Sequence, residues 1–129
     1  MNIDLRLFSI TDDYYIYTMY HEGIEVCKLL KGKEFLYIPV GDYTIEWEYN
    51  HEFGRRMPVL IHATHTNKYL IQYSNKQHKL KDNYAVCILD EKGVPFRSKL
   101  MFEEILKLLK ILTKNKEPLD VHIHKIFND

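Results

Sequence analysis

Hydrophobic and polar residues alternate in short runs along the first half of the chain, and a period of two predicts β-strands. The clearest run is 43–49, where tyrosine, isoleucine and tryptophan take every second position and threonine and glutamate lie between them. Such alternation is typical of a strand with one buried and one wet face. The strands predicted in this half are 3–10, 14–20, 24–30, 35–38, 43–49 and 58–62.

Turns and loops are predicted where glycine, proline, asparagine and charged residues gather between the runs. Gly41 and Asp42 are expected to form such a turn before the strand 43–49. Two longer polar stretches, 50–57 and 75–83, are expected to be loops. The early strands therefore follow one another closely, as in an antiparallel meander.

The second half contains two further predicted strands, one helix and a last strand. The run 68–74 alternates, whereas 84–89 is continuously apolar and is predicted to be a central strand buried on both faces. Ser98 is a predicted N-cap for a helix over 99–113, where polar residues recur at helical spacing along one narrow stripe. The broad apolar face of this helix predicts docking on a sheet or use in a homo-oligomer contact. A final strand is predicted over 121–127.

The composition predicts one α+β domain, mostly β, over residues 1–129. Hydrophobic residues make up 46% of the chain, which excludes intrinsic disorder, and the 10 tyrosines favour strands. The formal net charge of +0 predicts neither nucleic acid nor a membrane surface as a partner. Lys76, Lys79 and Lys81 could still form a local basic patch, with a solvated loop as the competing interpretation.

The N-terminus lacks the basic and apolar segments of a signal peptide, and no apolar stretch approaches the roughly 20 residues that span a bilayer. We therefore expect a protein kept inside a cell, with both cysteines as free thiols. Frequent lysine, asparagine, isoleucine and tyrosine fit an AT-rich genome, which many phages have. The expected location is a host cytoplasm or a virion.

Cys87 is the main candidate for chemistry, since a cysteine thiolate can act as a nucleophile. Such a cysteine needs a lowered pKa and some exposure. The surrounding run 85–89 is apolar, so the alternative is a buried cysteine that packs as a small hydrophobic residue. His62, at the end of a predicted strand, could serve as the base for the thiol.

Histidines suggest two half-sites for a metal, His62 with His65 and His122 with His124. Neither pair has further ligands at matching spacing, so partly exposed imidazoles and the polar face of an edge strand are the competing interpretations. The chain also lacks a phosphate-binding glycine motif and a serine nucleophile motif. We predict no metal and no cofactor.

Three motifs, taken in order, resemble those of a small phage-borne family of unknown function that is itself similar to L,D-transpeptidase domains. Pro-x-Gly-x-Tyr at 39–43 opens a predicted strand, and Ile-His-Ala at 61–63 ends another. Val-Cys-Ile-Leu at 86–89 matches three of the four positions of a Gly-Cys-Ile-Leu segment. The resemblance runs over most of the chain.

The helix carries the fourth element of this resemblance. Ser98, Phe102 and Ile105 match a helix of the form Ser-x-x-x-Phe-x-x-Leu that follows the cysteine strand in that family. The resemblance implies an L,D-transpeptidase-like β-sandwich, antiparallel or mixed, with one C-terminal helix and a final strand.

The resemblance also implies a site. Cys87 would be the nucleophile and His62 its base or orienting residue, in an attack on a peptide carbonyl of peptidoglycan stems. Tyr43, His65 and Ser98 would be binding residues beside them. The implied partner is thus a peptidoglycan peptide or a protein.

Two departures from the family pattern predict that the chemistry is lost. Val86 replaces the glycine beside the cysteine, and a β-branched residue there would crowd an oxyanion hole. Thr64 and His65 replace a Gly-Asn pair. The leading hypothesis is therefore a catalytically degenerate phage or mobile-element protein that acts by binding, in a virion or against a host component.

Two alternatives stay open at this point. The first is a thiol-dependent peptidoglycan peptidase or transpeptidase that uses Cys87 and His62. The second is a host-directed inhibitor, which predicts an exposed aromatic patch. The residues of that patch would be Tyr14, Tyr15, Tyr17 and Tyr20.

Overall fold

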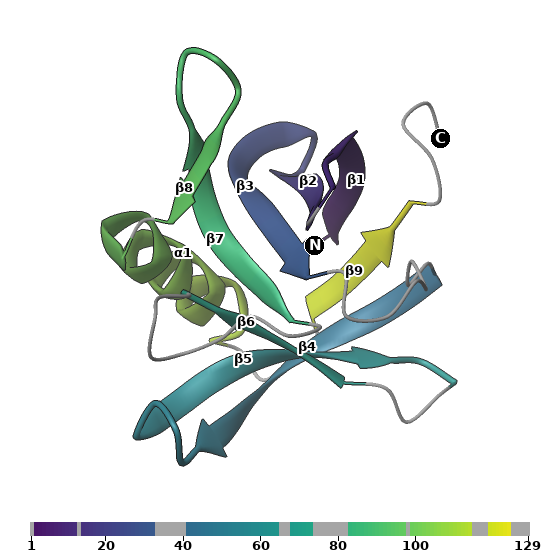
Figure 1. Ribbon diagram of the computed structural model, residues 1–129. Coiled ribbons are helices and arrows are strands. Elements are labelled where there is room, and N and C mark those ends of the chain that lie inside the picture. The colour runs from purple at the N-terminus through teal and green to yellow at the C-terminus, as the bar shows by residue number, and fades with distance from the viewer. Residues whose placement is uncertain are drawn as a thin grey trace.

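The computed structural model describes residues 2–12, 14–32, 41–64, 68–73, 83–97, 99–114 and 119–124. These residues form nine β-strands and one α-helix (Figure 1). In chain order the elements are β1 (Asn2–Ile10), β2 (Tyr14–His21), β3 (Ile24–Gly32), β4 (Gly41–Asn50), β5 (Arg55–His62), β6 (Lys68–Gln72), β7 (Tyr84–Leu89), β8 (Pro95–Arg97), α1 (Lys99–Leu112) and β9 (Leu119–Ile123).

The strands form one sheet that closes on itself. Neighbouring strands follow the order β3-β2-β1-β9-β4-β5-β6-β7-β8, and β3 also pairs with β7. That pairing sets Lys28 opposite Cys87 and Lys31 opposite Tyr84, which closes eight strands into a barrel with β8 attached to β7. The prediction of a mostly β fold with one late helix is confirmed. The β-sandwich that the resemblance implied is not confirmed, because the described strands form a closed barrel.

β9 joins the two halves of the barrel wall (Figure 1). It runs parallel to β1 on one side and antiparallel to β4 on the other, so Val121 lies opposite both Ile3 and Tyr43. The backbone amide of His124 continues the contact by donating to the Leu5 carbonyl at 2.9 Å. β9, the last strand among the described residues, is therefore a central strand of the wall.

Inward-facing side chains fill the barrel, and their alternation follows the predicted period of two. Tyr17 and Tyr84, both 0% exposed, meet edge to face with ring centres 5.6 Å apart. Lys31 is also 0% exposed, and its Nζ lies 5.3 Å from the centre of the Tyr69 ring. An aromatic face favours a cation in this position, so the lysine is accommodated among tyrosines.

α1 covers one end of the barrel, beside the hairpin of β4 and β5. Its Phe102 ring packs against Tyr73 with centres 5.2 Å apart, and the Trp47 indole nitrogen donates to the Thr113 hydroxyl at 3.0 Å. Among the described residues, no helix has the length and hydrophobicity that a membrane crossing requires. The helix residues that join the apolar core of the strands are Phe102, Ile105, Leu106 and Leu109.

Three local predictions differ from the structure. Gly41 and Asp42 begin β4 instead of forming a turn, and Gly41 has a φ of 113°, a conformation that favours glycine. β5 begins at Arg55, so the predicted loop 50–57 is shorter than expected. β8 has only 3 residues, too few for a periodic pattern to reveal. The predicted features outside the described residues are strand 35–38, the Ser98 cap, residues 126–127, Lys76, Lys79 and Lys81.

Candidate functional site

Cys87 lies in the barrel wall and is almost fully buried, at 1% exposure. It packs with Ile16, Leu30 and Ala85 in a small apolar cluster distinct from the barrel interior. Burial raises the pKa of the Cys87 thiol to about 11, although the nearby charge of Lys28 acts in the opposite direction. The thiolate is the reactive form of cysteine, so this environment disfavours nucleophilic chemistry at neutral pH.

His62 ends β5, and its imidazole meets the Tyr43 ring edge-on with ring centres 4.8 Å apart. Its Nδ1 accepts a hydrogen bond from the backbone amide of Thr64 at 3.0 Å. Because an N–H points at Nδ1, this nitrogen carries no proton in that arrangement. Its Nε2 faces Gly41, where an added Cβ would lie 3.4 Å away.

The structure does not bring Cys87 and His62 together. Because β6 pairs with both β5 and β7, positions on β5 and β7 can be compared along the strand direction. On this scale Val59 of β5 lies two residues away from Ala85 of β7. Cys87 lies beyond Ala85 toward the end that α1 covers, whereas His62 lies beyond Val59 toward the opposite end. The offset is about seven residue steps, or roughly 23 Å along the strands. This separation is far too large for a thiol–imidazole hydrogen bond.

The other predicted binding residues do not surround Cys87 either. Tyr43 is 2% exposed in the barrel interior, and His65 and Ser98 lie outside the described residues. The exposed tyrosine patch expected of a host-directed inhibitor is contradicted, because Tyr15 and Tyr17 are 7% and 0% exposed. Both side chains belong to the barrel core, since their positions on β2 face inward.

His122 and His124 each contact a carboxylate on a neighbouring strand of the barrel wall. His122 contacts Asp42 through Nδ1, and Nε2 of His124 lies 2.9 Å from Asp4. These two contacts link β9 to β4 on one side and to β1 on the other. Within the part of the chain that the structure describes, no group of three potential ligands could hold a metal ion.

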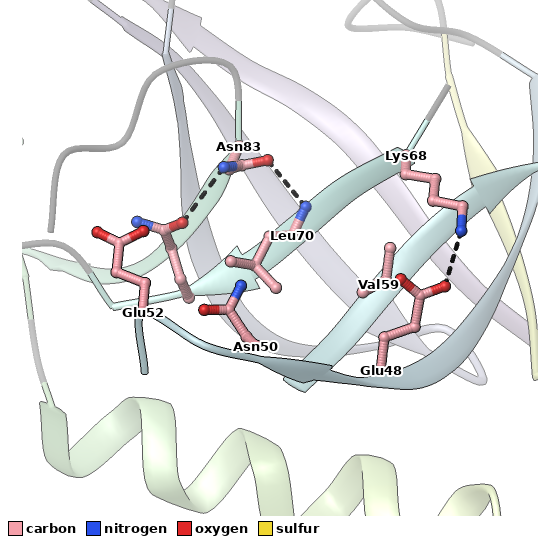
Figure 2. Close-up of a pocket in the computed structure, with 8 residues that line it drawn as sticks. Glu48, Asn50, Glu52, Val59, Lys68, Leu70 and Asn83 are labelled. Atoms are coloured by element: carbon pink, nitrogen blue, oxygen red, sulfur yellow. Dashed lines mark hydrogen bonds and ion pairs between the residues drawn. The ribbon is translucent and has the colours of Figure 1, made fainter. Parts of the chain in front are cut away.

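A polar groove of about 260 Å³ lies on the outer face of β4, β5 and β6 (Figure 2). Tyr69 and Ile71 point into the barrel, so the residues of β6 that alternate with them point outward into this groove. Its lining therefore comes from three adjacent strands, from the turn between β4 and β5, and from the residue that precedes β7. The lining residues are Glu48, Asn50, Glu52, Val59, Lys68, Leu70, Gln72 and Asn83.

Hydrogen bonds hold the amide side chains of the groove in place. Asn83 ties the start of β7 to β6, because its Oδ1 accepts from the Leu70 backbone amide at 2.9 Å and its Nδ2 donates to Gln72 at 3.3 Å (Figure 2). Asn50 Oδ1 accepts from the backbone amide of Phe53 at 3.0 Å, which directs its NH₂ group into the groove. The groove therefore presents amide groups in fixed positions.

Charged groups occupy the two ends of the groove. Lys68 Nζ lies 2.8 Å from a Glu48 carboxylate oxygen, and this hydrogen bond raises the pKa of the lysine. Glu52 holds its carboxylate at the other end (Figure 2). The groove thus combines a carboxylate, an ion pair and amides between them.

No protein-family model, curated protein or solved structure matches this chain. The groove's own side chains are therefore the basis for assigning its ligand. Sequence reasoning missed this site, although Glu48, Asn50 and Glu52 lie at alternate positions and gave a signal of one polar face. This alternation does not reveal which strands lie beside the polar face, and the neighbouring strands decide whether that face is flat or forms a groove.

Proposed function

We propose that this chain is a non-catalytic binding protein whose outer groove takes a short zwitterionic peptide, such as a peptidoglycan stem peptide. In this proposal the chain is related to the phage-borne, L,D-transpeptidase-like family that its motifs resemble, and it has lost the chemistry of that family. It acts by binding, in a virion or against a host component.

The placement of Cys87 is the observation that carries the proposal. A cysteine peptidase needs an accessible thiolate next to its base. Here burial raises the thiol pKa to about 11, and His62 lies roughly 23 Å away along the strands. The alternative of a Cys87–His62 enzyme therefore lacks both of its requirements.

The ligand class follows from the groups that line the groove. A peptide carries an ammonium, a carboxylate and amides in between. Glu52 can accept from the ammonium, Lys68 can donate to the carboxylate, and the Asn50 NH₂ can donate to a peptide carbonyl. Each of these three contacts uses a side chain that already faces the groove.

The test is a calorimetric titration with a stem tripeptide that contains a diamino acid. We expect saturable binding, and we expect Glu52→Gln and Lys68→Gln each to weaken it by about tenfold, because each removes one charge-assisted contact. Glu91→Gln is the matched control for Glu52→Gln, because it removes the same negative charge from the turn after β7, away from the groove. Absence of binding, or equal weakening by Glu91→Gln, would contradict the proposal.

A second measurement tests the lack of catalysis. The same peptide, and a cross-linked dimer of it, are incubated with the protein and followed by mass spectrometry. We expect no cleaved or exchanged product, and unchanged peptide binding in Cys87→Ala. Product that forms with the native chain and disappears in Cys87→Ala would overturn the non-catalytic assignment.

A further inference from the structure

A second cavity, of about 310 Å³, lies between the β4–β5 hairpin and the C-terminal end of α1. It is separate from the peptide groove. Three of its lining residues are cationic, and none is acidic. The lining residues are Trp47, Arg55, Arg56, Lys110 and Thr113.

Each side chain around this cavity is held by a separate contact. Arg56 donates from Nη2 to the Trp47 backbone carbonyl at 2.8 Å. Lys110 places its Nζ 5.9 Å from the centre of the Trp47 ring. The indole in turn donates to the Thr113 hydroxyl at 3.0 Å, so strand and helix together fix the tryptophan. The cations are thus positioned before any ligand arrives, which lowers the entropic cost of binding.

The cavity has an excess of positive charge. Arg55 is neutralised by Glu103, which it contacts through two guanidinium nitrogens at 2.8 and 3.4 Å. In the described part of the chain, no carboxylate is paired with Arg56 or Lys110. Arg56 uses one of its five N–H donors for the Trp47 carbonyl, so the other N–H groups of its guanidinium remain available for oxygen ligands.

The nearby helix end offsets only a small part of this charge, because a helix C-terminus is equivalent to about half of one negative charge. Helix C-termini carry partial negative charge because their last carbonyls lack partners. Here the Leu109 carbonyl accepts from both the backbone amide and the hydroxyl of Thr113, at 3.0 and 2.7 Å. Lys110 itself lies in the last turn of α1, where a cation is favourable.

We infer that this cavity is an anion site for phosphate monoesters, independent of the peptide groove. A phosphate monoester carries close to two negative charges above its second pKa of about 6, which matches the two uncompensated cations. The guanidinium of Arg56 suits two phosphate oxygens, and Lys110 supplies a point charge. The cavity also has room beside the Trp47 indole for the organic part of the ligand.

Trp47 is the only tryptophan of the chain, so its fluorescence reports on this cavity alone. The experiment titrates the protein with inorganic phosphate, glucose 6-phosphate and glucose at constant ionic strength and mildly alkaline pH. We expect a saturable change with both phosphates and none with glucose. Tighter binding of glucose 6-phosphate than of inorganic phosphate assigns an organic ester, and equal binding assigns free phosphate.

Charge variants make the site assignment specific. Arg56→Gln and Lys110→Gln are each expected to weaken phosphate binding by about tenfold, and Arg56→Lys by less, because it keeps the charge and loses the fork. The control is Lys107→Gln, which removes the same charge from an exposed position of α1 whose lysine is paired with Glu104 at 3.3 Å. Circular dichroism confirms that the variants fold. A titration without saturation at millimolar phosphate, or equal weakening by Lys107→Gln, overturns the inference.

Discussion

Alkaline conditions should destabilise this protein through its two buried thiols. Burial raises the pKa of Cys87 to about 11 and that of Cys27 to about 12, from an ordinary value of 9.0. For Cys27, the second cause is the charge of Cys87. The folded state thus keeps protons that the unfolded state releases as the pH rises through 9.0. The free energy of unfolding must fall over this range, and the contribution of Cys87 levels off above about pH 11.

The size of the effect follows from the shift. At about pH 10, an unfolded thiol is roughly nine-tenths ionised, whereas the folded Cys87 thiol is roughly one-tenth ionised. This difference is worth about 1.4 kcal/mol of stability, and Cys27 contributes a similar amount. Below about pH 8 neither thiol affects the free energy of unfolding, because each thiol is then protonated in both the folded and the unfolded state.

Urea unfolding of the native chain and Cys87→Ala at about pH 8 and about pH 10 measures this contribution. The native chain should lose about 1.4 kcal/mol more than Cys87→Ala between the two conditions. The cost of the cavity left by the substitution cancels in the comparison, because it is present at both pH values. Lysines and tyrosines that titrate in both proteins cancel as well. Equal losses in the two proteins would refute the assignment of Cys87 as a buried, protonated thiol.

Two further predictions concern the fold. Phe102→Ala should cost about 3–5 kcal/mol in urea unfolding because the ring is 0% exposed between α1 and the barrel, whereas Leu100→Ala, at 83% exposure, should change stability by less than about 0.5 kcal/mol. Similar losses would mean that the helix does not cover the barrel end. Gly41→Ala should lower the melting temperature more than Gly23→Ala, because the φ of 113° at Gly41 lies farther from the left-handed helical region that alanine can adopt than the φ of 80° at Gly23. Equal shifts would mean that the backbone at Gly41 accepts alanine without extra strain.

Local pattern was enough to predict most of the elements. The predicted strand 43–49 lies within β4, and the apolar strand 84–89 and the helix that begins at Lys99 are also found where they were expected. Each depends on the spacing of apolar and polar side chains over a few neighbouring residues, which the sequence records directly. The short β8 escaped prediction because three residues cannot establish a period.

Cys87 shows the limit of pattern for a candidate site. The apolar run around it correctly suggested burial, and its 1% exposure agrees with that reading. The sequence could not give its distance to His62, because that distance depends on the registers of β5, β6 and β7. The order of motifs along a chain does not determine the register between two strands. It therefore does not show whether two side chains lie side by side or on the same face of the sheet.

Hydrophobic periodicity is a local property, and it was enough to predict a mostly β domain with one amphipathic helix. The barrel follows from the pairing of β3 with β7 and from the position of β9 between β1 and β4, which are visible only in the folded chain. These pairings join segments that are distant in the chain and have no local signature. The two candidate sites depend on other tertiary contacts, because the peptide groove joins β4, β5 and β6 to Asn83 and the cavity beside Trp47 joins the β4–β5 hairpin to the end of α1.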